Sequence, residues 1–108
     1  MANYLLIQSR DPFEYTEVTR DFELAASLAK DGNKVTLFLV QNGVLPARKT
    51  AKGSGLQDVV ASGVEVLSDQ FSLRERGIHD DDLAAGVKAA SLDTVVDQLA
   101  EGRKAIWF

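Results

Sequence analysis

The sequence predicts an α/β fold with a mostly parallel sheet, and three observations support this prediction. Residues 3–8 (NYLLIQ) carry three consecutive apolar side chains in a segment too short for a helix, which indicates a buried strand. Residues 13–30 place apolar side chains at the 3.6-residue period of a helix, and residues 34–40 (KVTLFLV) are almost continuously apolar, as in a strand covered on both faces. Together these segments form a βαβ unit, so the two strands are expected to be parallel.

Shorter sequence patterns predict the turns, helices and third strand in the middle of the chain. Proline and the restricted residue before it favour a turn at residues 9–12, and a second turn is expected at residues 41–43. A short helix is expected over residues 45–52, with proline in its first turn, where the missing N–H does no harm. A further helix over residues 56–61 and a third strand over residues 64–67 follow.

The last third of the chain begins with residues 68–78, which read as a polar loop facing solvent. A short fourth strand is favoured around residues 86–88. Ser91 is a suitable N-cap for a helix whose apolar positions fall at i, i+3, i+4 and i+7; these positions are Leu92, Val95, Val96 and Leu99. Residues 103–108 (RKAIWF) are expected to form the final strand.

Aromatic side chains near the end of the chain have two interpretations. Trp107, Phe108 and Phe71 belong either to the core or to contacts between subunits. Aromatic residues are enriched in the cores of interfaces, and a small domain gains noticeably from such burial. An apolar terminus of this kind is therefore expected inside the sheet or against a partner.

Length, composition and charge define the class of protein. The 108 residues are expected to form one domain, and 45% hydrophobic with 26% charged residues is the composition of an ordinary globular protein. The net charge of −4 argues against a nucleic-acid partner, and the basic group Arg48, Lys49 and Lys52 is interpreted as a solvated face. No run is apolar enough for a membrane helix and no signal peptide precedes the first strand, so no membrane partner and a cytoplasmic location are expected.

Cysteine is absent from the sequence, which excludes disulfides and any thiol or persulfide chemistry carried by these 108 residues. His79 lies beside Asp80, Asp81 and Asp82, but adjacent loop residues point in different directions and no other histidine is present, so no metal site is expected. The segment around residues 52–55 (KGSG) lacks the spacing of a P-loop. No cofactor is therefore expected.

Several motifs in order resemble one family. They are NGV at residues 42–44 after an FLV strand, ASGVEV at residues 61–66, RGI at residues 76–78, and a closing helix that leads into a terminal hydrophobic strand. In this order they resemble the DsrE/DsrF-like sulfur-relay family over nearly the whole chain. The resemblance implies a small flavodoxin-like, three-layer α/β domain with about five strands that assembles into dimers, trimers or hexamers.

The resemblance also locates the site of the relay members. Their sulfur-carrying cysteine follows the third strand, and the corresponding place in this chain is about Asp69 or, in some relatives, about Ser72. Neither residue can hold a persulfide. The resemblance therefore implies a member without the relay cysteine, in which the fold and the location of the site remain.

Candidate site residues follow the expected carboxyl ends of the strands, where ligands bind in open α/β sheets. Hydroxyl and guanidinium donors in the loop after the third strand could bind a small anion; this set is Asp69, Ser72, Arg74 and Arg76, with Arg10 and Asn42 added from the loops after the first and second strands. The competing interpretation is a loop of caps and surface charges, in which Asp69 would repel an anion.

Three functional hypotheses follow. The first is an oligomeric, non-catalytic subunit or small-ligand-binding protein accessory to sulfur metabolism. The second is an enzyme in which Asp69 acts as general base and Ser72, Arg74 and Arg76 position an anionic substrate. The third is a subunit that assembles with a cysteine-bearing sulfurtransferase homologue or another sulfur-relay protein, which would supply the nucleophile.

Overall fold

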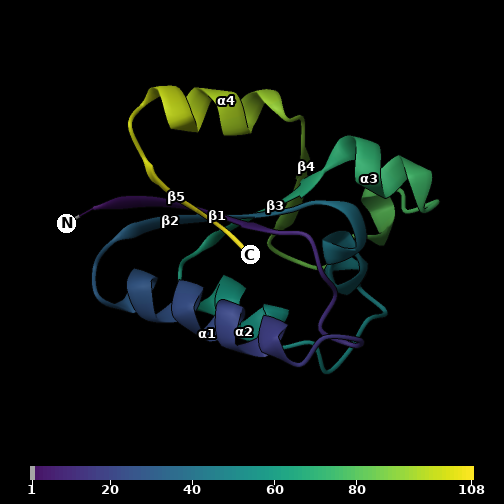
Figure 1. Ribbon diagram of the computed structural model, residues 1–108. Coiled ribbons are helices and arrows are strands. Elements are labelled where there is room, and N and C mark those ends of the chain that lie inside the picture. Colours follow the sequence, from purple (N-terminus) through teal and green to yellow (C-terminus); the bar gives the residue numbers. More distant parts are fainter. Residues whose placement is uncertain (1) are drawn as a thin grey trace.

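The computed structural model describes residues 2–108 as five strands and the helices that connect them (Figure 1). All strand pairs are parallel, and the order across the sheet is β4-β3-β2-β1-β5. The strands are β1 (Asn3–Gln8), β2 (Lys34–Leu39), β3 (Glu65–Asp69), β4 (Val87–Ala90) and β5 (Lys104–Trp107). This order differs from the 2-1-3-4-5 order of flavodoxin, because β5 returns to the free side of β1.

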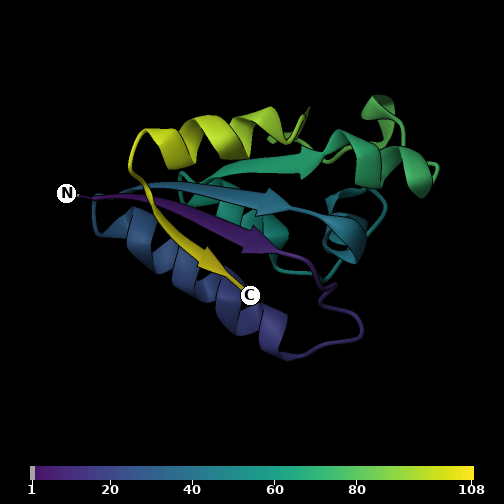
Figure 2. The same ribbon diagram turned by 45° about the horizontal axis from the view of Figure 1, so that its top comes forward.

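Helices cover both faces of the sheet, which confirms the expected three-layer α/β architecture. The helices are α1 (Glu17–Lys30), η1 (Gln41–Ala47, a 3₁₀ helix), α2 (Leu56–Ala61), α3 (Gln70–Glu75), η2 (Asp80–Asp82, a 3₁₀ helix) and α4 (Asp93–Ala100). Figures 1 and 2 show α1 and α2 on one face, α4 on the other, and α3 beyond the carboxyl end of β3. None of the helices within residues 2–108 is both long and apolar enough to cross a membrane.

The two faces of the sheet bury unequal cores. On the side of α1 and α2, a large cluster joins Leu6, Leu37 and Val66 of the strands to Val18 and Phe22 of α1. On the side of α4, a smaller cluster is packed against Val95 and consists of Leu5, Ile7, Phe38, Val40 and Leu67. Within residues 2–108, this face of the sheet is therefore covered by the eight-residue helix α4.

Two expectations for residues 9–52 need correction. The helix expected from residue 13 begins at Glu17, because Asp11 Oδ1 accepts hydrogen bonds from the N–H groups of Phe13 and Glu14 and forms a turn there. The helix expected over residues 45–52 is wrong, since the helical residues are those of η1. Arg48 is extended and forms an antiparallel bridge with Leu83, which ends η1 early.

The polar loop expected over residues 68–78 is also wrong. Strand β3 continues to Asp69, and residues 70–75 form α3. Asp69 is the N-cap of this helix, because its side chain accepts a hydrogen bond from the backbone N–H of Ser72. A six-residue helix is too short to leave a periodic pattern in the sequence.

Three of the four apolar positions expected for α4 are exposed rather than packed on the sheet. Leu92, Val96 and Leu99 are exposed, and Val95 alone of the four expected positions packs on the sheet. The buried side of α4 carries Gln98, whose Nε2 donates to Thr36 Oγ1 of β2 at 3.2 Å. The helix itself begins after Leu92, so Ser91 is not its N-cap, although Ser91 Oγ accepts a hydrogen bond from the N–H of Asp93 at 3.3 Å.

Candidate functional site

The carboxyl ends of β1, β2 and β3 lie at one edge of the sheet because the strands are parallel. The chain leaving β3 packs into the core on the side of α1 through Leu73 and Ile78, whereas the chain leaving β4 forms α4 on the opposite face. Neighbouring strands whose connections leave to opposite faces form the crevice where open α/β sheets bind ligands. Asp69, which is paired in register with Ala90, lies at this position.

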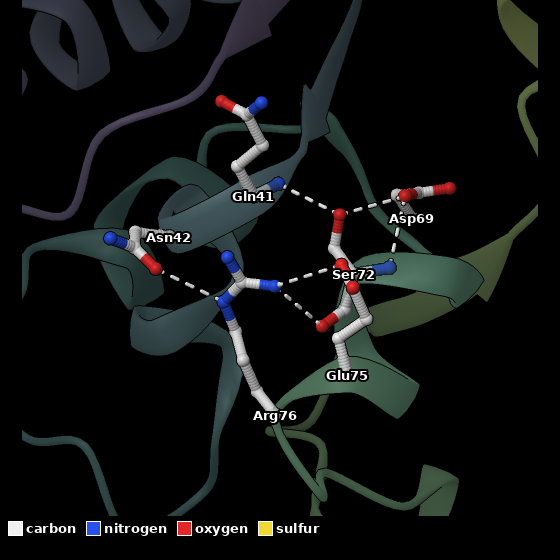
Figure 3. Close-up of polar contacts among 6 residues, drawn as sticks. All are labelled: Gln41, Asn42, Asp69, Ser72, Glu75 and Arg76. Carbon is white, nitrogen blue, oxygen red and sulfur yellow. Dashed lines mark hydrogen bonds and ion pairs between the residues drawn. The ribbon is translucent and has the colours of Figure 1, made fainter.

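Asp69 and Ser72 are joined by hydrogen bonds, which Figure 3 shows. Asp69 Oδ2 accepts from the Ser72 N–H at 3.0 Å and from Ser72 Oγ at 2.7 Å. Ser72 Oγ in turn accepts from the backbone N–H of Gln41, the first residue of η1, at 2.8 Å. Both side chains are buried. The two residues thus cap α3 and join it to η1.

A second contact between η1 and α3 involves Arg76 (Figure 3). Its Nε donates to Asn42 Oδ1 at 3.0 Å and its Nη1 donates to the Ser72 carbonyl at 3.0 Å. Glu75 lies 3.8 Å from the same guanidinium. Four of the residues expected at the site are therefore brought together at this edge: Asn42, Asp69, Ser72 and Arg76.

The other two expected site residues lie elsewhere. Arg10 forms an ion pair with Glu17 at 3.6 Å, and its guanidinium lies 5.1 Å from the centre of the Tyr15 ring. Arg74 lines a separate hollow of 370 Å³ near Gln70 and Asp80. Neither arginine contributes a hydrogen bond to the Asp69–Ser72 set among the described residues.

Comparison with known proteins places this fold in a family. A model of the DsrE/DsrF-like family matches residues 2–108. The chain belongs to the DsrE/DsrF-like family. Among curated proteins, no sequence matches it.

Solved structures share the DsrE/DsrF-like fold at low sequence identity. A protein of unknown function from Methanobacterium thermoautotrophicum is 21% identical with a TM-score of 0.87, and each chain is covered completely. The ychN protein from E. coli is also 21% identical, with a TM-score of 0.88 and complete coverage of both chains. A conserved protein of unknown function from Bacteroides thetaiotaomicron is 16% identical, with a TM-score of 0.77 over 97% of this chain and 94% of that one.

The chemistry open to this DsrE/DsrF-like site is limited by its own hydrogen bonds. A general base must reach the proton that it removes, but Asp69 Oδ2 already accepts both donors of Ser72. Ser72 directs its hydroxyl proton to that carboxylate. His79 and Asp82 cap η2, with Asp82 Oδ2 accepting from the His79 N–H at 2.9 Å. No group of three or more metal-ligating side chains is found within residues 2–108.

Two basic residues near the site were not among those expected from the sequence. Arg48 and Lys49 line a pocket of 230 Å³ together with Arg76 of the DsrE/DsrF-like site. The basic composition of residues 48–52 was visible in the sequence, but its position beside Arg76 was not. That position depends on the bridge between Arg48 and Leu83, residues 35 positions apart in the chain, which no local pattern announces.

Proposed function

We propose that this DsrE/DsrF-like chain is a non-catalytic subunit of a homo-oligomer, accessory to sulfur-relay proteins. The observation that supports the proposal is the uncovered apolar surface on the α4 side of the sheet. We call it the α4–β5 surface and define it as Leu92, Val96, Leu99 and Trp107.

The α4–β5 surface combines a helix stripe with an edge strand. Val96 is 63% exposed and Trp107 is 71% exposed. Trp107 pairs in register with Ile7, which belongs to the core cluster under α4, so the tryptophan side chain lies on the same side of the sheet as α4. In the sheet order, β5 is an edge strand, which offers unpaired backbone groups to a partner. Exposed apolar side chains on a helix and an edge strand of one face are suited to burial in an interface.

The non-catalytic part of the proposal rests on the Asp69–Ser72 set. At the place that the family resemblance assigns to the relay cysteine, this chain has a carboxylate that caps α3 and a serine that binds both that carboxylate and η1. One carboxylate oxygen and the serine hydroxyl are thus engaged in holding α3 and η1 together. They support a structural role for the segment that carries sulfur in relay members.

Sedimentation velocity over a range of protein concentrations tests the oligomer. The wild-type chain is expected to sediment as an oligomer, and Val96→Asp, which introduces a charge into the α4–β5 surface, should shift it to monomer. Leu24→Asp is the matched control, because Leu24 is an exposed leucine, 39% accessible, on α1 at the opposite face. A wild-type monomer at all concentrations would refute the homo-oligomer, as would equal behaviour of the two variants.

The single tryptophan provides an independent readout. Burial of Trp107 in an interface should shift its fluorescence emission to shorter wavelengths in the oligomer and return it to longer wavelengths in Val96→Asp. Purification from the native host, with and without reductant, then tests the accessory role. Recovery with a sulfur-handling protein supports that role, and recovery of this chain alone contradicts it.

A further inference from the structure

We infer that the pocket between Arg48, Lys49 and Arg76 binds a dianionic oxyanion, either free or as the phosphate of a small monoester. The pocket has a volume of 230 Å³ and is also lined by Thr50, Gly77, Ile78 and Asp82. The inference is independent of the proposed oligomer, since none of these residues belongs to the α4–β5 surface.

Backbone contacts bring the three cations together from distant parts of the chain. The extended residue Arg48 bridges to Leu83, and the N–H of Lys49 donates to the Asp82 carbonyl at 2.7 Å. This fixes residues 48–49 against the segment that follows α3. Arg76, the C-cap of α3, contributes the third cation from the other side of the pocket.

Both arginines are held in place before any ligand arrives. Arg48 Nε donates to the Leu45 carbonyl at 2.8 Å, and Arg76 is fixed through Asn42 and the Ser72 carbonyl. Such preorganisation lowers the entropy cost of binding, because the side chains do not have to be ordered by the ligand. Guanidinium groups also suit oxyanions through paired hydrogen bonds.

The pocket is positively charged, whereas the whole chain is negatively charged. Three cations and one carboxylate line it, although the chain carries a net charge of −4. The carboxylate, Asp82, accepts a hydrogen bond from the His79 N–H, and Glu75 shares the guanidinium of Arg76 from outside the pocket lining. With both carboxylates counted, the three cations leave a local excess of one positive charge, which favours an anion such as phosphate or sulfate.

An adjoining groove shows where a larger ligand would extend. This groove has a volume of 430 Å³, shares Arg48 and Lys49 with the pocket, and adds Lys52 and the glycine-rich residues 53–55. An anion held by the shared cations can therefore carry a substituent that lies in the groove. This geometry fits a phosphate monoester as well as a free oxyanion.

Isothermal titration calorimetry at constant ionic strength tests the inference, with sodium phosphate, sodium sulfate and glycerol phosphate as separate ligands and chloride as the background anion. The wild-type chain should bind at least one of the three in a saturable manner. Lys49→Gln should weaken this binding by about tenfold, because one charge-assisted contact is lost. Lys88→Gln, which removes an exposed charge of β4 outside both cavities, should leave it unchanged.

A third variant is expected to change the binding affinity in the opposite direction. Asp82→Asn removes the carboxylate of the lining while keeping an oxygen for the His79 N–H, and should strengthen binding by roughly two- to fivefold. Preference for glycerol phosphate would identify the monoester source, and preference for inorganic phosphate or sulfate the free anion. Absence of saturable binding by all three ligands overturns the inference, and so does binding that is equal in Lys49→Gln and Lys88→Gln.

Discussion

Replacing Ser72 with alanine tests whether the Asp69–Ser72 set is a structural unit. The hydroxyl of Ser72 is buried and makes two hydrogen bonds, to Asp69 Oδ2 at 2.7 Å and from the Gln41 N–H at 2.8 Å. Alanine removes both contacts but keeps the backbone N–H of residue 72, which also donates a hydrogen bond to Asp69 Oδ2. The helix cap therefore remains, and the loss isolates the side-chain part of the set.

The expected cost follows from the two contacts. A hydrogen bond to a charged group contributes about 1.5–3 kcal/mol, and an ordinary one about 0.5–1.5 kcal/mol. Gln41 is exposed, so water replaces part of the second bond. We expect Ser72→Ala to lower the free energy of unfolding by about 2–3 kcal/mol, which lowers Tm by roughly 10–15 °C in a domain of this size.

Urea denaturation followed by circular dichroism measures this cost. The matched control is Ser62→Ala, because Ser62 also donates a side-chain hydrogen bond, to the Asp58 carbonyl, but does so at an exposed site. The free energy of unfolding of this control should fall by less than about 0.5 kcal/mol. In a double-mutant cycle with Asp69→Ala, the two changes should couple by about 1–2 kcal/mol. Additive effects, or a Ser72→Ala cost no larger than that of the control, would refute the structural interpretation.

Three further predictions concern the edge of the sheet around β1 and η1. Burial raises the pKa of Asp21 above its ordinary value of 3.8, against the lowering effects of the hydrogen bond from Gln8 and the charge of Arg10. The folded state then binds the proton more tightly, so the contribution of Asp21 to stability should fall as pH rises above 3.8, and the urea midpoint of the wild-type chain should fall relative to that of Asp21→Asn over this range. Gln41 has a φ of 53°, so Gln41→Gly should raise the free energy of unfolding by up to about 1 kcal/mol in the same assay. Gly43→Ala should lower it by about 2–3 kcal/mol or more, because the new Cβ would lie 2.3 Å from the Gln8 carbonyl oxygen.

The parts of the fold that the sequence predicted are those in which local pattern and tertiary environment agree. Strands β1 and β2 are buried over most of their length and are mainly apolar, and α1 carries Val18, Phe22 and Ala25 on one side at helical spacing. For the same reason the sequence predicted that the segments leaving β1, β2 and β3 lie together, since parallel strands have their carboxyl ends at one end of the sheet.

The parts that could not be predicted depend on contacts between distant residues. Helix α4 was expected from its periodicity, but the periodicity did not say that its apolar stripe would face outward. That orientation is fixed by Gln98, which reaches Thr36 on β2, 62 positions away in the sequence. For α3, a local signal was present, because aspartate is among the residues favoured at a helix N-cap.

Two groups of polar side chains lie side by side at the carboxyl ends of the strands: the Asp69–Ser72 set, whose hydrogen bonds hold the fold, and a pocket in which cations outnumber carboxylates. Asp69 and Ser72 bind each other and the N–H of Gln41, so a ligand at that point would have to replace hydrogen bonds that stabilise the fold. In the neighbouring pocket, the cations outnumber the carboxylates. Binding energy for an anion is therefore available at Arg48, Lys49 and Arg76 without loss of the α3 cap. A ligand site that leaves the Asp69 cap intact must therefore lie beside the cap, as the pocket of Arg48, Lys49 and Arg76 does.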